Sequence, residues 1–334
     1  MTEENPLLDA QKKFIDAVPF RAMAREKKAL EQTLGMTLYT DLKSPENSPS
    51  YHRAIVEGFL VNTEDTREAS EENPVSFSIA GDVSPGDEFC PGFLSGQAVS
   101  VATGSIIPEG DYSIVRMWEA KRDGNNITIT RPFPPRFFIE EEGCEIKQGS
   151  VVIEAGAVLS PAYLGAAASL GLETLEVASP PKVTVFSSGD EVIHHSEEMR
   201  PGAIRDCNSV MLSAAVMEAG GVPDFAGIMS DDFDGFVRKA RNALKTSDML
   251  LISGGTAVDG RDFISDLIRE LGDLLVDGVQ MRSGRPLIMG VSGGKPIVCV
   301  AGYPPEALRG FELFGVMAIK QLLGRNSKLG TFTK

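Results

Sequence analysis

Acidic side chains follow three predicted strands in the C-terminal half of the chain, at the point where each strand ends. They are Asp190 and Glu191 after residues 182–187, Asp231 and Asp232 after residues 223–228, and Asp262 after residues 249–252. Because ligands bind at the carboxyl ends of parallel strands, we expect these carboxylates to gather at one rim of a sheet. There they could hold a hard cation such as Mg²⁺ that bridges to phosphate or another oxyanion.

Helix capping is the alternative for each of these residues taken singly. An acidic residue after a strand usually lies at the start of a helix, where the helix dipole favours it. Asp232 fits that alternative better than a catalytic role. The turn Ser188-Gly-Asp-Glu191 is too constrained for a simple solvated surface, which makes Glu191 the better functional candidate. The convergence of three such sites favours a cation site over three separate caps.

The loop from Ser253 to Asp262 leaves the most apolar of these strands. Residues 249–252 are apolar throughout and are followed by Gly254 and Gly255, which is typical of an interior strand of a parallel sheet. The loop therefore delivers Asp262 to the strand's carboxyl end, where a ligand would bind.

Two arginines, Arg282 and Arg285, flank a Ser-Gly turn in an otherwise acidic part of the chain. They could bind a phosphate or another oxyanion bidentately, although arginines in a loop are as often solvated surface residues. The turn at residues 302–305 adds a fourth loop at the same rim, and Thr103 adds a hydroxyl from the middle of the chain.

The composition excludes several classes of function. The 32 Lys and Arg residues against 47 Asp and Glu residues give a formal net charge of -15, which disfavours nucleic acid and anionic membranes as partners. The four cysteines form no CxxC pair, and the adjacent His194 and His195 diverge, so no zinc site or disulfide framework is expected. With no signal peptide and no apolar run of about 18 residues, we expect a cytoplasmic protein. The motifs G-x-S-x-G and GxxxxGK[ST] are absent, which disfavours covalent and P-loop catalysis.

Strands and helices alternate in the C-terminal half, which predicts an α/β fold with a mostly parallel sheet and helices on both faces. Predicted strands cover residues 182–187, 223–228, 249–252 and 297–301, and predicted helices cover residues 209–219, 236–245, 262–271 and 307–323. The predicted parts are a discontinuous helical or mixed domain (1–45 and 136–180), a β-rich domain (46–135), the α/β domain (181–326) and a tail (327–334). In the first part, residues 6–34 are expected to form two amphipathic helices.

Taken in order, these motifs resemble those of the molybdopterin molybdenumtransferase (MoeA-like) family, which completes the molybdenum cofactor. The family has S-T-G-D-E, an Asn-containing helix start, D-D, S-G-G-V-S-V-G-x-x-D, K-P-G-K-P and P-G-N-P. This chain has Ser187-Ser-Gly-Asp-Glu191, Arg205-Asp-Cys-Asn208, Asp231-Asp232, the loop from Ser253 to Asp262, Arg282-Ser-Gly-Arg-Pro286 and Ala301-Gly-Tyr-Pro304. Residues 44–61 and 101–115 are similar to two further family motifs, so the resemblance runs along most of the chain.

The resemblance implies a molybdopterin-binding three-layer fold and Mg²⁺-assisted insertion of molybdate into adenylylated molybdopterin, with release of AMP. The implied catalytic residues are Glu191, Asp262, Asp231 and Thr103, and the implied metal ligands are Asp190, Glu191 and Asp262. The implied substrate contacts are Ser188, Gly189, Asp190, Asn208, Gly254, Gly255, Arg282, Arg285 and Glu57. The family's members are dimers in which the β part of one subunit lies near the α/β domain of the other, which would bring Thr103 and Glu57 to the site. A molybdoenzyme or another cofactor-biosynthesis protein is a further expected partner.

Several positions differ from the family pattern. Glu57 replaces an aspartate, Ala257 a serine and Tyr303 an asparagine, and a basic run appears here as Glu140-Glu141-Glu142. Reversing the charge of an anion-facing cluster would weaken the binding of pyrophosphate or molybdate unless the acidic run is screened or displaced. The chain also ends near the point where the family continues into a small C-terminal β domain.

Two other functions remain open on these residues. A non-catalytic relative would bind molybdopterin or a nucleotide as a cofactor carrier or chaperone, which the acidic run favours and the retained Asp190, Glu191 and Asp262 disfavour. A Mg²⁺-dependent nucleotide phosphohydrolase on the same sheet would turn over nucleotides without any pterin.

Overall fold

A computed structural model of the chain describes residues 5–230, 232–255, 263–282 and 284–325. The chain divides into two compact units. The first contains Met1–Asp41 and Ile153–Lys334, and the second contains Leu42–Val152. The boundaries of the three domains expected from the sequence stay a prediction.

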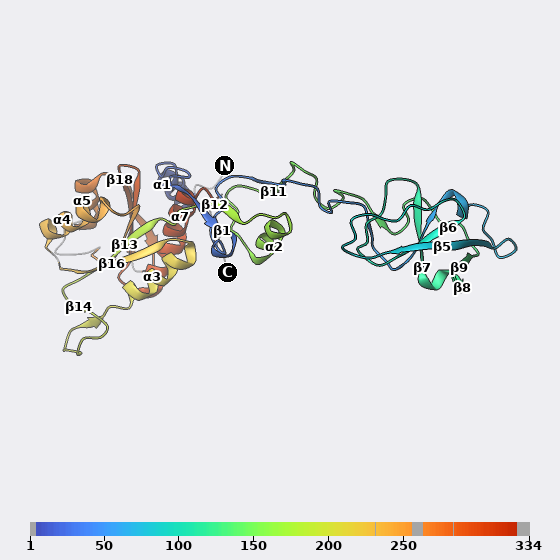
Figure 1. The fold of residues 1–334 in the computed structure, drawn as a ribbon. Helices are drawn as coiled ribbons and strands as arrows, with labels where there is room; N and C mark the ends of the chain where they lie inside the picture. The colour runs from blue at the N-terminus through green and yellow to red at the C-terminus, as the bar shows by residue number, and fades with distance from the viewer. Residues whose placement is uncertain (1–4, 231, 256–262, 283, 326–334) are drawn as a thin grey trace. The chain divides into compact units, whose positions relative to one another are not determined.

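The first unit is built on a six-stranded mixed sheet (Figure 1). In spatial order its strands are β16 (Val222–Met229), β13 (Lys182–Ser188), β17 (Met249–Ser253), β20 (Lys295–Val300), β19 (Gly284–Ser292) and β18 (Asp273–Met281). The first four strands run parallel, and the hairpin of β18 and β19 extends the sheet antiparallel. The carboxyl ends of β16, β13, β17 and β20 therefore meet at one rim.

Helices cover both faces of this sheet, as the residues of β17 illustrate. Met249 and Leu251 pack in one core with residues of α1 (Pro6–Ile15) and α3 (Asn208–Ala219). Leu250 and Ile252 pack in a second core with residues of α4 (Phe233–Leu244) and α5 (Phe263–Leu271). All four side chains are fully buried, which explains why this strand is apolar at every position. The predicted three-layer α/β fold is confirmed.

The prediction of two helices within residues 6–34 is wrong for the second one. After α1 the chain forms β1 (Arg25–Ala29), which pairs antiparallel with β12 (Thr174–Ala178), and a short 3₁₀ turn at Leu30–Gln32. Pro19 follows α1, and Arg21 has a left-handed backbone with φ of 53°. A helix cannot continue through this conformation, and the remote partner β12 decides the structure of the next segment.

The long helix predicted near the C-terminus is interrupted by a π-helical turn. It consists of α6 (Pro304–Gly310), the π turn Phe311–Gly315 and α7 (Val316–Leu323). Residues of all three parts pack in the same core as α1 and α3. At its far end, Arg325 donates hydrogen bonds to Thr37 Oγ1 and to the backbone oxygen of Ala219. The helix thus joins the rim of the sheet to the N-terminal segment.

Short elements complete the first unit. They are α2 (Pro161–Ser169), β14 (Val192–Ile193) and β15 (Ile204–Arg205), whereas β11 (Val151–Ile153) stands where the chain passes from the second unit to the first. The strands β14 and β15 pair with each other at the base of an excursion of the chain between β13 and α3 (Figure 1). Among the described residues, no helix of either unit combines the length and the apolar character needed to cross a membrane.

The second unit is a curled six-stranded sheet with apolar side chains on both faces. In spatial order its strands are β7 (Tyr112–Arg116), β4 (Gly58–Asn62), β6 (Gln97–Val101), β5 (Val75–Val83), β9 (Asn126–Ile129) and β8 (Lys121–Asp123). Its short elements are β2 (Leu42–Lys43), β3 (Arg53–Ala54), β10 (Ile139–Glu140) and the 3₁₀ turns Glu64–Thr66 and Met117–Glu119. Phe59 and Val61 of β4 pack in one core, and Leu60 between them packs in another. This alternation is what strand geometry requires when both faces are covered.

An acid-sensitive ion pair lies at the surface of the second unit, where Glu119 contacts Arg116 and Arg131. The hydrogen bond from Arg116 is the main cause that lowers the pKa of Glu119 to about 2. A carboxyl whose pKa is lowered on folding stabilises the fold above its ordinary pKa, and the stabilisation is lost as the pH falls from about 4.5 towards 2.

Glu119→Gln should therefore lower the free energy of unfolding of the second unit by about 1 kcal/mol at pH 7, and the difference from the unsubstituted protein should shrink between pH 4.5 and 2. Urea denaturation followed by the fluorescence of Trp118, the single tryptophan, measures this. Glu64→Gln is the matched control, because the Glu64–Arg67 pair is exposed and contributes little. A Glu119→Gln effect independent of pH would contradict the prediction.

Candidate functional site

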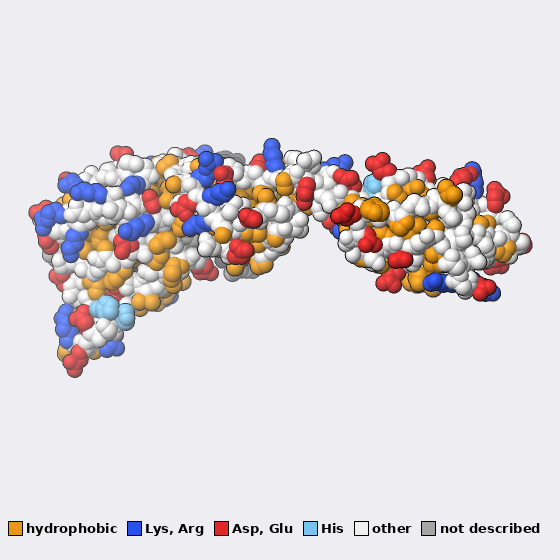
Figure 2. Space-filling model, in the orientation of Figure 1, with side chains coloured by type: hydrophobic (Ala, Val, Ile, Leu, Met, Phe, Trp, Pro, Cys, Tyr) orange, Lys and Arg blue, Asp and Glu red, His pale blue; other side chains and the backbone are white. Residues whose placement is uncertain are grey.

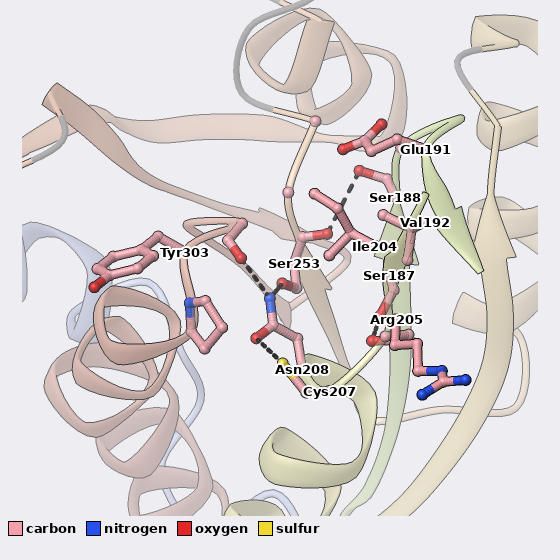
Figure 3. A pocket seen from close by; sticks show the side chains of 16 residues that line it. Ser187, Ser188, Glu191, Val192, Ile204, Arg205, Cys207, Asn208, Ser253 and Tyr303 are labelled. Carbon is pink, nitrogen blue, oxygen red and sulfur yellow. Dashed lines mark hydrogen bonds between the residues drawn. The ribbon is translucent and has the colours of Figure 1, made fainter. Parts of the chain in front are cut away.

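A cavity of about 570 Å³ opens at the carboxyl rim of the parallel strands in the first unit (Figure 3). Its walls come from the ends of β13 and β17, from the turn after β20, from the start of α3 and from β14 and β15. Val192 and Ile204 lie on one side, Tyr303 lies on the opposite side, and Asn208 and Ser253 lie between them. The cavity thus combines apolar walls with a polar floor.

The register of the sheet brings the polar floor together. Ser187 of β13 is level with Ser253 of β17, and Ser253 is level with Val300 of β20. Because neighbouring strands lie about 4.8 Å apart, residues at one level line a common edge. The site is therefore positioned by strands that are buried on both faces.

Asn208, the first residue of α3, joins two of these strand ends. Its Nδ2 donates to Ser253 Oγ at 2.7 Å and to the backbone oxygen of Gly302 at 2.8 Å. Both amide hydrogens are therefore used inside the protein. The side chain holds the turn after β20 against the end of β17.

Asp206 ties the end of β13 to the start of α3. Its Oδ1 accepts from Ser187 Oγ and from the backbone N–H of Ser209, both at 3.0 Å. The residue is 3% exposed, and its Oδ2 has no hydrogen-bond partner among the described residues. Buried polar atoms without a partner are rare, because each costs free energy. Asp206 is among the residues around the cavity, but its Oδ2 is itself fully buried.

Two glycines keep the loop after β17 close to β13. Gly254 and Gly255 have φ of +89° and +72°, which favours glycine at both positions. A Cβ on Gly254 would lie 2.8 Å from the backbone oxygen of Ser188, and a Cβ on Gly255 would lie 2.7 Å from Ser188 Oγ. Neither position has room for a side chain unless the neighbouring turn moves.

Glu191 folds back over the turn that carries it. A Cβ on Gly189 would lie 2.7 Å from Glu191 Oε2, so the carboxylate lies directly over this glycine. Glu191 is exposed and lines the cavity. Its carboxylate is therefore available to a ligand.

The cavity gathers six of the residues expected from the sequence. These are Ser188, Gly189, Glu191, Asn208, Gly254 and Gly255. Asp190 is exposed beside them but does not line the cavity. Asp231, Ala257 and Asp262 lie outside the described residues. The roles assigned to all of them stay predictions.

Arg282 follows β18 directly, Arg285 is the second residue of β19, and neither lines the cavity. The strand β20 separates β19 from β17 in the sheet. The guanidinium of Arg285 donates to the backbone oxygens of Asp277 and Gly278, at 2.9 and 2.8 Å. In this structure that side chain is held by its own hairpin, so binding an anion would require it to leave these carbonyls.

Glu57 and Thr103 belong to the second unit. Glu57 lines a separate cavity of about 260 Å³ together with Asp82, Ser84 and Ser100. Thr103 is an exposed turn residue after β6. Their expected approach to the site across a dimer stays a prediction.

The acidic run at residues 140–142 is paired within the second unit. Arg53 forms ion pairs with Glu140 and Glu145, and Arg136 lies 3.7 Å from Glu141. Asn47 Nδ2 donates to Glu142 Oε1 at 2.7 Å. Acidic side chains are spread over the visible face of this unit (Figure 2). The charge reversal noted in the sequence is thus partly compensated by residues of the same unit.

The described part of the site could supply Mg²⁺ with few protein ligands. Over the described ranges, no three His, Cys, Asp or Glu side chains are grouped so that they could hold a metal. Mg²⁺ usually keeps several waters and takes one or two carboxylates together with substrate phosphates. Glu191 supplies such a carboxylate at the cavity. The side chains of His194 and His195 do not diverge as expected, since their ring centroids lie 4.1 Å apart at a tilt of 36°, but neither residue lines the cavity.

Four polar residues around the cavity were not expected as site residues from the sequence: Ser187, Asp206, Cys207 and Ser253. Asp206 and Cys207 stand in the segment that resembled the family's helix start, from which only Asn208 was singled out. The available signal was an acidic residue three positions before Ser209, the pattern of a helix N-cap. That pattern predicts a structural role and gives no sign that the residue borders a cavity.

Comparison with known proteins gives two matches that together span most of the chain. Residues 6–171 match the family model "MoeA N-terminal region (domain I and II)", and residues 184–321 match "Probable molybdopterin binding domain". A putative molybdopterin biosynthesis protein of Methanocaldococcus jannaschii is 32% identical over 282 residues, which cover 82% of this chain and 69% of that protein. The molybdopterin molybdenumtransferase of Bacillus subtilis is 31% identical over 86% of this chain and 68% of its own length.

The fold has a similar counterpart among solved structures. The crystal structure of a molybdopterin biosynthesis MoeA protein from Pyrococcus horikoshii superimposes with a TM-score of 0.82 at 30% sequence identity. The match covers 97% of this chain and 81% of the other. The similarity therefore extends over both compact units.

Gly254→Ala should lower the free energy of unfolding of the first unit more than Gly35→Ala does. Both positions have left-handed backbones, which cost a non-glycine residue about 1–2 kcal/mol. At Gly35 nothing lies within 4 Å of the added Cβ, whereas at Gly254 the clash with Ser188 should add about 1–3 kcal/mol. Urea denaturation of the two variants measures the difference, and equal losses would show that the close approach of the two turns is unimportant.

Proposed function

We propose that this chain inserts molybdate into adenylylated molybdopterin and releases AMP. The chain belongs to the MoeA family of molybdopterin molybdenumtransferases, which is the basis of the proposal. The observation that carries the proposal is the cavity at the carboxyl rim of β13, β17 and β20. It combines the exposed carboxylate of Glu191, glycine turns that let a ligand approach the backbone, and a buried polar floor. A pterin joined to a nucleotide needs a cavity with apolar walls and a few directed polar groups, which these walls supply.

Some residues of the site would bind the ligand, and others would act on its phosphate end. Ser188, Gly189, Gly254 and Gly255 form the turns against which the ligand lies, and Asn208 keeps those turns in place. Glu191, with Asp190, Asp231 and Asp262, would act at the phosphate end of the ligand. Mg²⁺ bound by Glu191, Asp190 and Asp262 would offset the charge of the phosphate oxygens.

A homodimer is part of the proposal. Glu57 and Thr103 would act on the ligand held by the other subunit, so that Thr103 Oγ1 can donate to an oxygen of the substrate. Arg282 and Arg285 would bind molybdate or phosphate after the Arg285 guanidinium leaves the carbonyls of Asp277 and Gly278.

A non-catalytic carrier of molybdopterin is the second candidate, and the side chain of Arg285 favours it. An arginine that is hydrogen-bonded to its own hairpin does not contribute to anion binding in that conformation. A carrier would bind adenylylated molybdopterin and hand it to a molybdoenzyme or another cofactor-biosynthesis protein without releasing AMP. Activity that is indifferent to both Glu191→Gln and Asp262→Asn would favour the carrier.

Glu191→Gln should lower the rate of AMP release from adenylylated molybdopterin about 100-fold in the presence of molybdate and Mg²⁺, because it removes a charge at the reacting end of the ligand. Glu197→Gln is the matched control. Glu197 is exposed on the excursion between β14 and β15, does not line the cavity, and accepts the backbone N–H of His194 through an oxygen that glutamine retains. Equal rates for the two variants would remove Glu191 from the mechanism, and AMP release without pterin would indicate a nucleotide phosphohydrolase.

Adenylylated molybdopterin should protect Cys207 from alkylation, because this exposed cysteine lines the cavity. Cys144 is also exposed but lies in the second unit, so its alkylation rate serves as the internal reference. Burial raises the pKa of Cys90 to about 11 and also raises the pKa of Cys299, so neither thiol should compete at neutral pH. Mass spectrometry after brief treatment with iodoacetamide measures each site. Equal protection of Cys144 and Cys207, or of neither, would place the ligand elsewhere.

A further inference from the structure

Tyr303 is the only aromatic residue among the described residues that line the site cavity. It is 59% exposed and lies on the side opposite Val192 and Ile204 (Figure 3). Its ring points away from Asn208 and Ser253, which lie between these two sides. The ring therefore forms the outer edge of the cavity and no part of its floor.

The backbone of Tyr303 is held from two directions. On one side, Asn208 Nδ2 donates to the backbone oxygen of the preceding residue, Gly302, at 2.8 Å. On the other side, the Tyr303 oxygen accepts from the backbone N–H groups of Glu306 and Ala307, at 3.1 and 2.9 Å. The Cβ of Tyr303 is thus fixed in place before any ligand arrives, so binding through this side chain orders little of the backbone.

The side chain of Tyr303 has no task within the protein. It stands at the N-cap of α6 and makes no capping hydrogen bond. None is needed, because Pro304 and Pro305 have no N–H and the next two N–H groups are bound by the Tyr303 oxygen. Within the described part of the chain, the hydroxyl has no hydrogen-bond partner and the ring contacts no other ring or cation.

An aromatic ring at this position changes what the cavity can bind. The family pattern has asparagine here, which offers hydrogen-bond donors and an acceptor. Tyrosine offers instead a flat apolar face, which a second flat ring covers well in an offset stack. Stacking of a heteroaromatic base on such a face tolerates different bases, because each of them has a π-face.

We propose that Tyr303 stacks on a flat heteroaromatic ring of the ligand at the outer edge of the cavity and thereby sets the affinity for that ring. The inference rests on the proposed function, whose ligand contains two such groups, an adenine and a pterin. It assigns Tyr303 to ligand binding and gives it no part in the chemical step.

Three substitutions and two probes test this role. Tyr303→Ala removes the ring, and Tyr303→Phe keeps the ring but removes the hydroxyl. Tyr163→Ala is the matched control, because Tyr163 of α2 is 38% exposed and does not line the cavity. AMP and pterin are titrated into each protein, and their ring protons are followed by ligand-observed NMR. Protons that lie over the face of a tyrosine ring move to lower chemical shift.

The unsubstituted protein should move the ring protons of at least one probe to lower chemical shift. Tyr303→Ala should abolish this movement and weaken the binding of the same probe about 10-fold. Tyr303→Phe and Tyr163→Ala should retain both the shift and the affinity. The probe that responds identifies the stacked ring as adenine or pterin.

Two results would overturn the inference. Unchanged shifts and affinities in Tyr303→Ala would show that the ring meets no ligand. Equal losses in Tyr303→Phe and Tyr303→Ala would show that the hydroxyl binds the ligand through a hydrogen bond and that stacking contributes nothing.

Molybdate insertion assayed in parallel separates this inference from the proposed function. Tyr303→Ala should raise the KM for adenylylated molybdopterin about 10-fold and leave kcat within about 2-fold, because a binding residue acts equally on substrate and transition state. Insertion with an unchanged KM would remove only the role of Tyr303. A protein that stacks Tyr303 on AMP but neither binds pterin nor inserts molybdate would keep this inference and lose the proposed function.

Discussion

The amide group of Asn208 is the contact on which the geometry of the site depends. It lies at the first turn of α3 and fixes the end of β17 and the turn after β20 at once. Since Gly302 directly precedes Tyr303 and α6, the same contact also places the start of that helix. Asp206, two residues earlier, holds the end of β13 in the same way. A short segment before α3 therefore sets the distances between three strand ends.

Much of the first unit could be predicted from its sequence, because the signal was local and strong. A strand buried on both faces must be apolar at each position, and residues 249–252 show that pattern directly. The turn-forming glycines marked where the strands end. Residues 25–29 gave the opposite case, since REKKA has no strand-like alternation and becomes β1 through its pairing with the distant β12. Such pairing is a tertiary effect that local propensity does not contain.

The chemistry of the site was less accessible from sequence than its location. The aspartates and arginines at the strand ends indicated where the rim lies. They did not indicate which side-chain N–H and O–H groups already donate hydrogen bonds within the protein. Arg285 looked like an anion ligand, yet its guanidinium binds the carbonyls of its own hairpin. Asp206 was not singled out from the sequence, yet its Oδ1 holds the end of β13 to the start of α3 and its Oδ2 has no partner among the described residues. In both cases the decisive fact is the direction of a hydrogen bond, which depends on atoms far apart in the chain.

The acidic run of the second unit illustrates the same limit for charge. Summed along the sequence, residues 140–142 and the net charge of -15 suggest repulsion of any anion. In the folded unit, Arg53 and Arg136 pair with members of that run, and Asn47 binds another. Local pairing lowers the field that an approaching ligand meets, because opposite charges a few ångströms apart largely cancel at a distance. Formal charge therefore overstates the barrier.

The π turn between α6 and α7 has a consequence for how this sequence can change. A turn closed by i→i+5 bonds holds about one more residue than an α-helical turn, and each α-helical residue rotates by about 100°. The turn at residues 311–315 thus takes up one extra residue without rotating the half that begins at the cavity rim against the half that packs on α1. Loss of one residue here would restore an α-helical turn and keep both halves in phase, so a single-residue gap between homologous sequences should be tolerated at this turn better than elsewhere in the helix.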